Sequence, residues 1–237
     1  MMLHPIKVKL KQELDILRGR QSRLSKGVQI SHRWYGHPHA GFFVCPDLVR
    51  ENALVYSFGT GEDVSFDIAM IQHHNCTVHA FDPTPKSIEW VARQSLPSGF
   101  HFHPYGIGAE TGTVQFNLPA NESHVSGSIV DYSHLDTRKR IEVPMRSFPD
   151  ILSELGLRRI DVLKMDIEGS EYEVIPTILA AEVEIGQILV EIHERYFPDG
   201  REKTRKMLEL LNEHGFQVFG VSDSLEEISL IHTSLLT

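Results

Sequence analysis

Short apolar runs alternate with amphipathic segments along most of the chain. Strands are predicted where apolar residues run together and stop at polar or glycine residues, and helices where apolar residues recur three and four positions apart. The predicted strands are Ala53–Phe58, Cys76–Phe81, Gly99–Pro104, Asp161–Met165, Gln187–Ile192, Phe216–Val221 and Ile228–His232. The predicted helices are Val64–His74, Lys86–Gln94, Ser147–Leu155, Glu171–Ala180 and Arg201–His214.

This alternation predicts an α/β fold with a mostly parallel seven-stranded sheet and helices on both faces. The last two predicted strands follow one another closely, which favours an antiparallel pair. Ligands of such sheets bind beyond the carboxyl ends of the strands, near the point where the strand order reverses. Candidate chemistry is therefore expected at residues 58–63, 82–84, 105–108, 166–169 and 191–194.

Two segments depart from this alternation. Residues 1–50 precede the domain at 51–237, and they contain a predicted surface helix at 5–24 and a stretch rich in histidine and aromatic residues at 25–50. We expect Trp34, Tyr35 and Phe42 of this N-terminal cap to pack as a lid.

The second departure follows the third strand. Gly112–Leu118 is predicted as the return arm of a hairpin, because Glu110-Thr111-Gly112 is a turn signal. The polar stretch 119–140 is predicted as a loop.

Composition narrows the class of protein. The 237 residues are 41% hydrophobic and carry a formal charge of −9 without a long basic run, which disfavours a duplex nucleic-acid partner. The N-terminus has no uninterrupted apolar core of a signal peptide, and no stretch approaches the roughly 20 apolar residues of a membrane span. Two cysteines cannot form a disulfide framework.

A cytoplasmic protein is expected, and the N-terminal helix makes a homodimer possible.

A Gly-x-Gly turn follows the first strand of the domain, where Phe58-Gly59-Thr60-Gly61 leads through Glu62 to Asp63. Glycines let a backbone turn tightly and approach a ligand closely. Taken alone, the motif is also consistent with an ordinary turn.

Asp82 ends the next strand, 21 residues after Gly61. A carboxylate in this position can accept hydrogen bonds from both hydroxyls of a ribose, or it can serve as a turn or helix-cap residue before Pro83. The NAD fingerprint needs a third glycine at position 64, which is Val64, and no Gly-Lys-Ser/Thr follows the turn. S-adenosylmethionine (SAM) has no pyrophosphate and does not need that glycine, so SAM is favoured.

The fourth strand runs into the sequence DVLKMDIEGSEYEVI at 161–175, which resembles the signature of the FkbM-type SAM-dependent methyltransferases through Asp166, Glu168, Gly169 and Glu171. The segments YSFGTGED at 56–63, VHAFDP at 78–83 and YGIGAETGTVQF at 105–116 agree with it. The resemblance covers roughly residues 52–220. It implies a Rossmann-like class I methyltransferase fold and SAM as the cofactor.

The resemblance also implies positions for the cofactor. SAM would lie across Phe58, Gly59, Thr60, Gly61 and Asp63, with its ribose on Asp82. Pro83, Gly106, Ile107 and Gly108 would flank the adenine, and Asp166 would lie near the methyl group. Many SAM enzymes carry an acid where this chain has Ser57. The amino group of the cofactor would then be held by Asp63, by backbone carbonyls or by an acid of the fourth strand.

A hydroxyl acceptor benefits from a base, and the candidates are Asp166, Glu168 and His193, with Glu191 as a fourth. Glu168 and Glu171 could instead only favour the helix N-terminus, and His193 could be structural. Asp166 with Glu191 or His193 could also bind a divalent cation, which is not favoured. The spacing of His32, His37, His39 and Cys45 fits no standard zinc module.

The expected function is methylation of a hydroxyl on a small molecule or sugar. Three alternatives stay open: an N-methyltransferase acting on a protein or peptide, a non-catalytic member that binds SAM or a partner, and an NAD-dependent enzyme.

Overall fold

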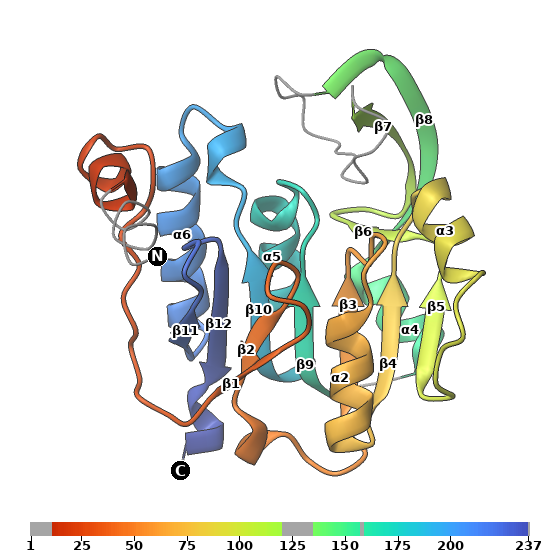
Figure 1. Ribbon diagram of the computed structural model, residues 1–237, viewed down its shortest axis with the longest axis horizontal. Helices are drawn as coiled ribbons and strands as arrows, with labels where there is room; N and C mark the ends of the chain where they lie inside the picture. The colour runs from red at the N-terminus through yellow and green to blue at the C-terminus, as the bar shows by residue number, and fades with distance from the viewer. Residues whose placement is uncertain (1–10, 120–134, 157–158, 237) are drawn as a thin grey trace, which may run out of the picture.

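The central sheet has seven strands, in the order β11-β12-β10-β9-β3-β4-β5 (Figure 1). The computed structural model describes residues 11–119, 135–156 and 159–236. The strands are β3 (Leu54–Phe58), β4 (Thr77–Phe81), β5 (Phe100–His103), β9 (Arg159–Met165), β10 (Glu184–Glu191), β11 (Phe216–Val221) and β12 (Glu227–His232). Only β12 runs antiparallel to its neighbours β10 and β11. The predicted mostly parallel sheet and its antiparallel closing pair are confirmed.

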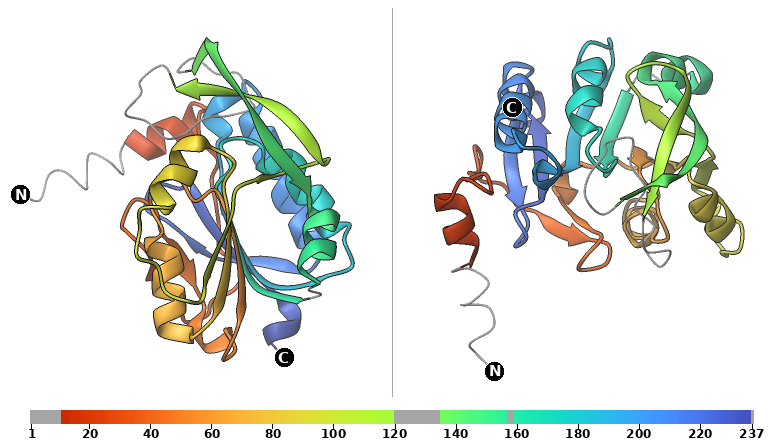
Figure 2. Two further views of the ribbon diagram at one scale, coloured as in Figure 1. Left: turned by 90° about the vertical axis from the view of Figure 1, so that its right-hand side faces the viewer. Right: turned by 90° about the horizontal axis from the view of Figure 1, so that it is seen from above.

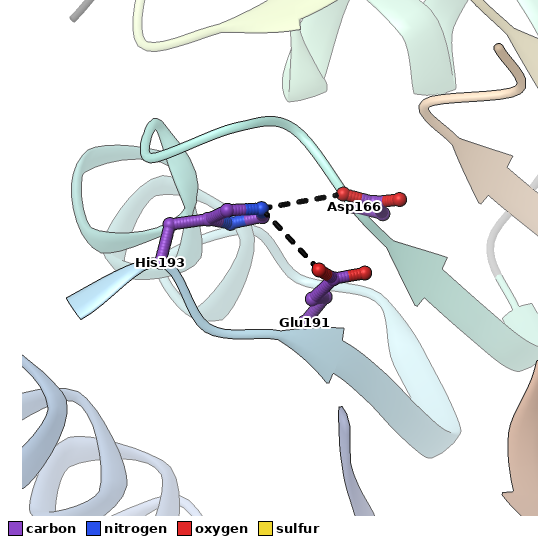
Figure 3. A group of neighbouring side chains, drawn as sticks. All are labelled: Asp166, Glu191 and His193. Carbon is purple, nitrogen blue, oxygen red and sulfur yellow. Dashed lines mark ion pairs between the residues drawn. The ribbon is translucent and has the colours of Figure 1, made fainter. Parts of the chain in front are cut away.

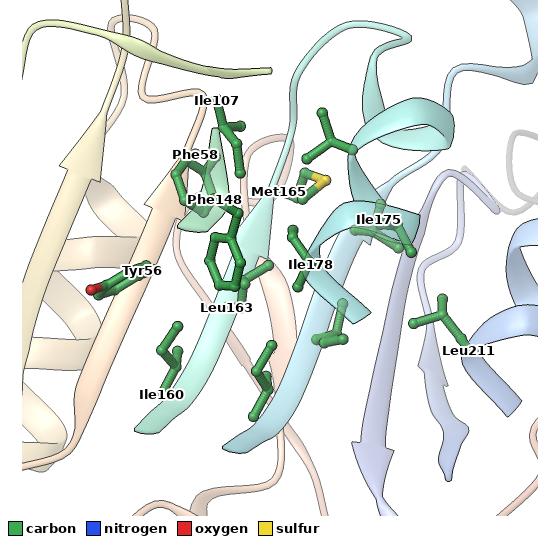
Figure 4. Packing of buried hydrophobic residues seen from close by; sticks show 14 of the residues in the cluster. Tyr56, Phe58, Ile107, Phe148, Ile160, Leu163, Met165, Ile175, Ile178 and Leu211 are labelled. Carbon is green, nitrogen blue, oxygen red and sulfur yellow. The ribbon is translucent and has the colours of Figure 1, made fainter. Parts of the chain in front are cut away.

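Helices cover both faces of this sheet (Figure 2). On one face lie α2 (Ser65–His74) and α3 (Pro85–Val91), and on the other α4 (Phe148–Leu155), α5 (Glu171–Leu179) and α6 (Gly200–Glu213). The core under the second group gathers residues such as Phe148, Ile178 and Leu211 against Leu163 of the sheet (Figure 4). These helices form because their apolar residues recur on one side, which burial against the sheet then stabilises.

The N-terminal segment contributes a hairpin, β1 (Arg33–Tyr35) and β2 (Phe42–Val44), which the apolar pattern did not predict. The hairpin packs beside α2 and over β10–β12. Phe42 and Val44 join the core of that face. Tyr35 packs on α2, and its hydroxyl lies 2.9 Å from Nε2 of His74. Residues 11–17 are helical, while residues 5–10 of the predicted helix lie outside the described part of the chain.

A small second sheet extends beyond the carboxyl edge of the first (Figure 1). It consists of β6 (Gly106–Gly108), β8 (Leu135–Ser147) and β7 (Gly112–Pro119), in the order β6-β8-β7. The predicted hairpin at the 110–112 turn is wrong, since β6 and β7 do not pair with each other and both pair with β8. The loop prediction for 119–140 fails at its end, where β8 begins, and residues 120–134 are not described. Pairing between distant segments decides both differences, and local turn signals do not report it.

The ends of the parallel strands set the position of the site. The chain passes from β3 outward to β4 and β5, then returns to β9 and proceeds outward on the other side to β10. The strand order therefore reverses between β3 and β9, where open α/β sheets bind their ligands. Within the described part of the chain, no helix is both long and apolar enough to cross a bilayer.

Candidate active site

A cavity of about 340 Å³ opens at the carboxyl ends of β3, β4 and β9. This volume falls within the range of small-molecule pockets. Twelve of the predicted site residues line it: Phe58, Gly59, Thr60, Gly61, Asp63, Asp82, Pro83, Gly106, Ile107, Asp166, Glu168 and Glu191. Ala40 and Phe42 of the N-terminal hairpin reach it as well. Residues from widely separated stretches of sequence therefore meet around one cavity.

The Gly59 turn is shaped by the neighbouring strand end. Gly59 has φ +82°, and a Cβ atom there would lie 1.6 Å from the backbone oxygen of Asp166. The amide of Asp166 donates to the carbonyl of Phe58 at 3.0 Å, so the two strand ends are also bonded to each other. Only glycine combines this backbone conformation with this contact. The turn brings β3 and β9 together and leaves its own backbone at the wall of the cavity.

Asp82 has structural partners in addition to its place in the cavity wall. Its Oδ2 accepts from the Gly61 amide at 2.8 Å, and its Oδ1 accepts from the amide and hydroxyl of Thr84 at 2.9 and 2.6 Å. Thr84 in turn caps α3. Each carboxylate oxygen can accept more than one hydrogen bond. Asp82 can therefore stabilise the turn and still accept hydrogen bonds from a ligand.

The adenine side of the predicted site is a close-packed wall. A Cβ atom on Gly106 would lie 2.7 Å from the sulfur of Met145 and 3.0 Å from Cγ of Pro83. Ile107 is buried at the same wall. The small sheet thus supplies one side of the cavity, through β6 and through Met145 of β8.

On the opposite side, four carboxylates surround the imidazole of His193. Its Nε2 lies 3.5 Å from Glu191 and 3.7 Å from Asp166 (Figure 3). The same atom lies 3.4 Å from Glu168. Its Nδ1 lies 3.2 Å from Oε1 of Glu171, which also accepts from the His193 amide at 2.9 Å. His193 is only 1% exposed, so it lies behind the cavity wall and does not line it.

Burial and charge act strongly on this cluster. Burial alone would lower the pKa of His193, but the hydrogen bond to Glu171 and the charges of Glu171, Asp166 and Glu168 raise it to about 10. Burial and the neighbouring charge of Asp166 raise the pKa of Glu191 to about 9, against the opposing effect of His193. The imidazole is therefore an imidazolium at neutral pH, held among carboxylates.

Asp166, Glu191 and His193 also present one ligand atom each, all within 4.8 Å of one another. Oxygen and imidazole ligands in this number could hold a divalent cation. The same geometry serves an imidazolium equally well. In the described residues, His32, His37, His39 and Cys45 do not gather into a comparable group.

Sequence reasoning missed two charged residues of the cavity wall, Asp67 on α2 and Lys164 on β9. Their signal was present in the sequence, because each is a charged residue at a position that the apolar pattern assigns to the core. Only 2% of Asp67 and 6% of Lys164 is exposed. Tyr196 was also missed, and its hydroxyl donates to Oε2 of Glu168 at 2.7 Å.

The strand order, the glycine turn at the end of β3 and the acid at the end of β4 are those of the class I SAM-dependent methyltransferase fold. The sequence matches the methyltransferase FkbM domain over residues 56–218. The chain belongs to the FkbM methyltransferase family.

Relatives of known sequence agree with this family. A probable methyltransferase-like protein 24 of Homo sapiens is 30% identical over 155 residues, which are 64% of this chain and 36% of that protein. The 31-O-demethyl-FK506 methyltransferase FkbM of Streptomyces tacrolimicus is 24% identical over 215 residues, covering 78% of this chain and 80% of the relative. The chain therefore spans about a third of the length of the human protein, and most of the length of the bacterial one.

Among solved structures, the fibrillarin of Methanococcus jannaschii has a TM-score of 0.46 at 13% identity, covering 80% of this chain and 69% of the other. The fibrillarin of Aeropyrum pernix, solved with natively bound S-adenosyl-L-methionine, has a TM-score of 0.41 at 10% identity, with coverage of 77% and 66%.

Proposed function

We propose that this protein methylates a hydroxyl group of a small molecule or sugar, with Asp166 as the base. The observation that carries the proposal is the position of Asp166. It ends β9 at the cavity wall, and its Oδ1 is buried without a hydrogen-bond partner in the described part of the chain. This oxygen has only the 3.7 Å ion pair to His193, so it can still accept a hydrogen bond from a group that enters the cavity.

The cavity fits the cofactor on independent grounds. Gly59 and Gly106 keep its walls free of Cβ atoms that would meet backbone or side-chain atoms. When bound, SAM supplies a methyl carbon attached to a sulfonium leaving group. Residues Phe58–Asp63 would hold the cofactor across the turn, Asp82 would accept from its ribose, and Pro83, Gly106 and Ile107 would flank its adenine.

The base has a defined task in this reaction. Asp166 would accept the proton that the acceptor hydroxyl loses, while SAM would supply the methyl group and leave as the neutral thioether. A hydroxyl is a weak nucleophile at neutral pH, so removal of its proton contributes to the rate. Positioning of the two reactants contributes as well.

His193 is better suited to hold the base than to act as one. Its pKa of about 10 keeps it protonated at neutral pH, so it cannot take the proton of the acceptor. Its charge offsets those of Asp166 and Glu168 and keeps both side chains in place. Glu168, next to the Tyr196 hydroxyl, would contact the acceptor from the same side.

The acceptor class rests on two points. An amine acceptor needs less help from a base, so the carboxylate cluster at the cavity wall supports a hydroxyl. The Streptomyces relative bears the name of an O-methyltransferase, which supports the same chemistry here.

The test is transfer of labelled methyl groups from SAM to acceptors bearing hydroxyls or amines, using the wild type and Asp166→Asn. We expect a hydroxyl acceptor whose turnover falls about 100-fold or more in the variant. The Kd for SAM should change less than about threefold, a free-energy difference under 1 kcal/mol. The exposed Asp223 provides the matched control, Asp223→Asn.

Two results would contradict the proposal. Methylation of an amine that survives in Asp166→Asn would establish an N-methyltransferase. SAM binding without turnover on any acceptor would indicate a non-catalytic member of the family.

A further inference from the structure

Asp67 is a buried acid that the mechanism above does not use. It lies in the first turn of α2 and lines the cavity, although only 2% of the residue is exposed. Its Oδ1 has no hydrogen-bond partner in the described part of the chain. A buried carboxylate oxygen without a partner is costly, so such an atom points to a ligand.

Lys164 faces the same end of the cavity from β9. Its Nζ donates to the carbonyl of Gly59 at 2.5 Å and lies 5.9 Å from the centre of the Phe42 ring. Burial raises the pKa of Asp67 to about 6, and the charge of Lys164 opposes that rise. An acidic and a basic side chain therefore lie at one wall of the cavity without forming a direct ion pair.

The surroundings of Asp67 account for a departure noted in the sequence. Its carboxyl lies beside Ser57, the strand-end position at which many SAM enzymes carry an acid. The buried Ser57 hydroxyl faces this carboxyl and lowers its pKa, and it has no other partner among the described residues. The acid of this chain thus approaches the same place from α2 instead of from β3.

We propose that Asp67 and Lys164 form the subsite for the amino-acid end of SAM, with Asp67 receiving its ammonium group and Lys164 its carboxylate. The charges of the subsite are complementary to that zwitterion. The subsite lies beside the Gly59 turn, whereas Asp82, the acid predicted for the ribose, contacts Gly61. The proposal rests on SAM being the cofactor and is independent of the acceptor.

Asp63 was the earlier candidate for the ammonium group, and it has another role. Its Oδ1 accepts from the Ser65 amide at 2.7 Å, at the start of α2. Asp63 therefore already bonds one of the amides that the beginning of a helix leaves unpaired. Asp67 has no such bond to its Oδ1, which makes Asp67 the better partner for a cation.

Binding measurements with four ligands test the subsite without any acceptor. S-Adenosylhomocysteine and 5′-methylthioadenosine share a nucleoside thioether and differ in the amino-acid end. SAM and decarboxylated SAM differ only in the carboxylate. In Asp67→Asn, we expect the affinity for S-adenosylhomocysteine to fall about 10- to 100-fold, while the affinity for 5′-methylthioadenosine stays within about twofold.

The double variant Asp67→Asn with Lys164→Met provides a second test in case the single variant does not fold. It leaves no uncompensated charge in the wall, because both partners are removed together. We expect this double variant to lose the preference for S-adenosylhomocysteine over 5′-methylthioadenosine and for SAM over decarboxylated SAM. Asp223→Asn is the control and should bind all four ligands as the wild type does.

The outcomes separate clearly. Equal weakening of all four ligands, or preserved preferences in the double variant, would overturn the subsite. Failure of the wild type to bind either SAM or S-adenosylhomocysteine would instead overturn the assignment of SAM as the cofactor.

Discussion

The backbone oxygen of Asp166 lies in the space that a side chain at Gly59 would need. A Cβ atom at position 59 would be 1.6 Å from that oxygen, so the ends of β3 and β9 can be adjacent only because residue 59 is glycine. This contact brings the cofactor turn and the proposed base to one place. A small change at position 59 should therefore disturb the fold and the site together.

Three glycine-to-alanine variants separate the reasons for this glycine. In Gly59→Ala we expect the free energy of unfolding to fall by about 3 kcal/mol or more, because left-handed backbone and a clash act together. Gly156 has φ +67° with nothing within 4 Å of an added Cβ, so Gly156→Ala should cost only about 1 kcal/mol. Gly112 has neither feature, and Gly112→Ala should lie within about 0.5 kcal/mol of the wild type. Urea unfolding measures all three, and equal effects at positions 59 and 156 would refute the role of the Asp166 contact.

Stability should depend on pH through Glu191. Its pKa is about 4.3 in an unfolded chain and about 9 in the folded protein, where burial and Asp166 disfavour its charge. Between these values the folded protein holds a proton that the unfolded chain has lost, so stability falls as the pH rises through this window. Glu191→Gln mimics the protonated side chain and should reduce the loss between pH 5 and 8.5 by on the order of 2 kcal/mol.

Urea unfolding at several pH values checks this, with the exposed Glu213→Gln as the control. His193 acts in the same direction at higher pH. Its pKa rises from 6.5 to about 10 on folding, so its contribution is complete below about 6.5 and is lost as the pH passes through 10. In Glu191→Gln, the free energy of unfolding should therefore still fall with pH at high pH. If its dependence on pH below 8.5 equalled that of the wild type, the assignment to Glu191 would be contradicted.

Asp82 should affect every ligand that contains the ribose. In Asp82→Asn we expect SAM, S-adenosylhomocysteine and 5′-methylthioadenosine all to bind about 10-fold more weakly, because a charged acceptor is lost from the diol and from the Gly61 amide. Thr84→Val is the matched control, since it removes one partner of Asp82 and leaves the carboxylate. Equilibrium binding measures these affinities. If only the ligands with the amino-acid end bound more weakly, Asp82 would not contact the ribose.

Metal removal should leave the protein functional. The His193 imidazolium already offsets the charge of Asp166, so a divalent cation would have to displace the proton from its Nε2. We expect SAM binding and methyl transfer in EDTA to stay within about twofold of their values in Mg²⁺, a difference below 0.5 kcal/mol. Thermal unfolding with and without Mn²⁺ is an independent measurement. A tenfold loss in EDTA that Mg²⁺ restores would establish a metal enzyme.

Much of the site could be predicted because strand ends are local features. Gly59, Asp82 and Asp166 each follow a recognisable apolar run, and parallel strands bring their carboxyl ends to one edge. Lys164 and Asp67 escaped attention because neither lies in the strand-end segments where ligands were expected. Their partnership depends on how α2 packs on β9, and no pattern within either element reports it.

The sequence by itself determined the alternation of strands and helices, the parallel sheet with its antiparallel end, and the edge at which ligands bind. Periodicity and turn residues are local properties, and they suffice for these conclusions. Only the tertiary structure decided the placement of β6 and β7 on either side of β8, the packing of the N-terminal hairpin on the sheet, and the protonation of His193. Each of these depends on contacts between distant segments or on burial among several charges. The residues adjacent in sequence do not determine such contacts or such burial.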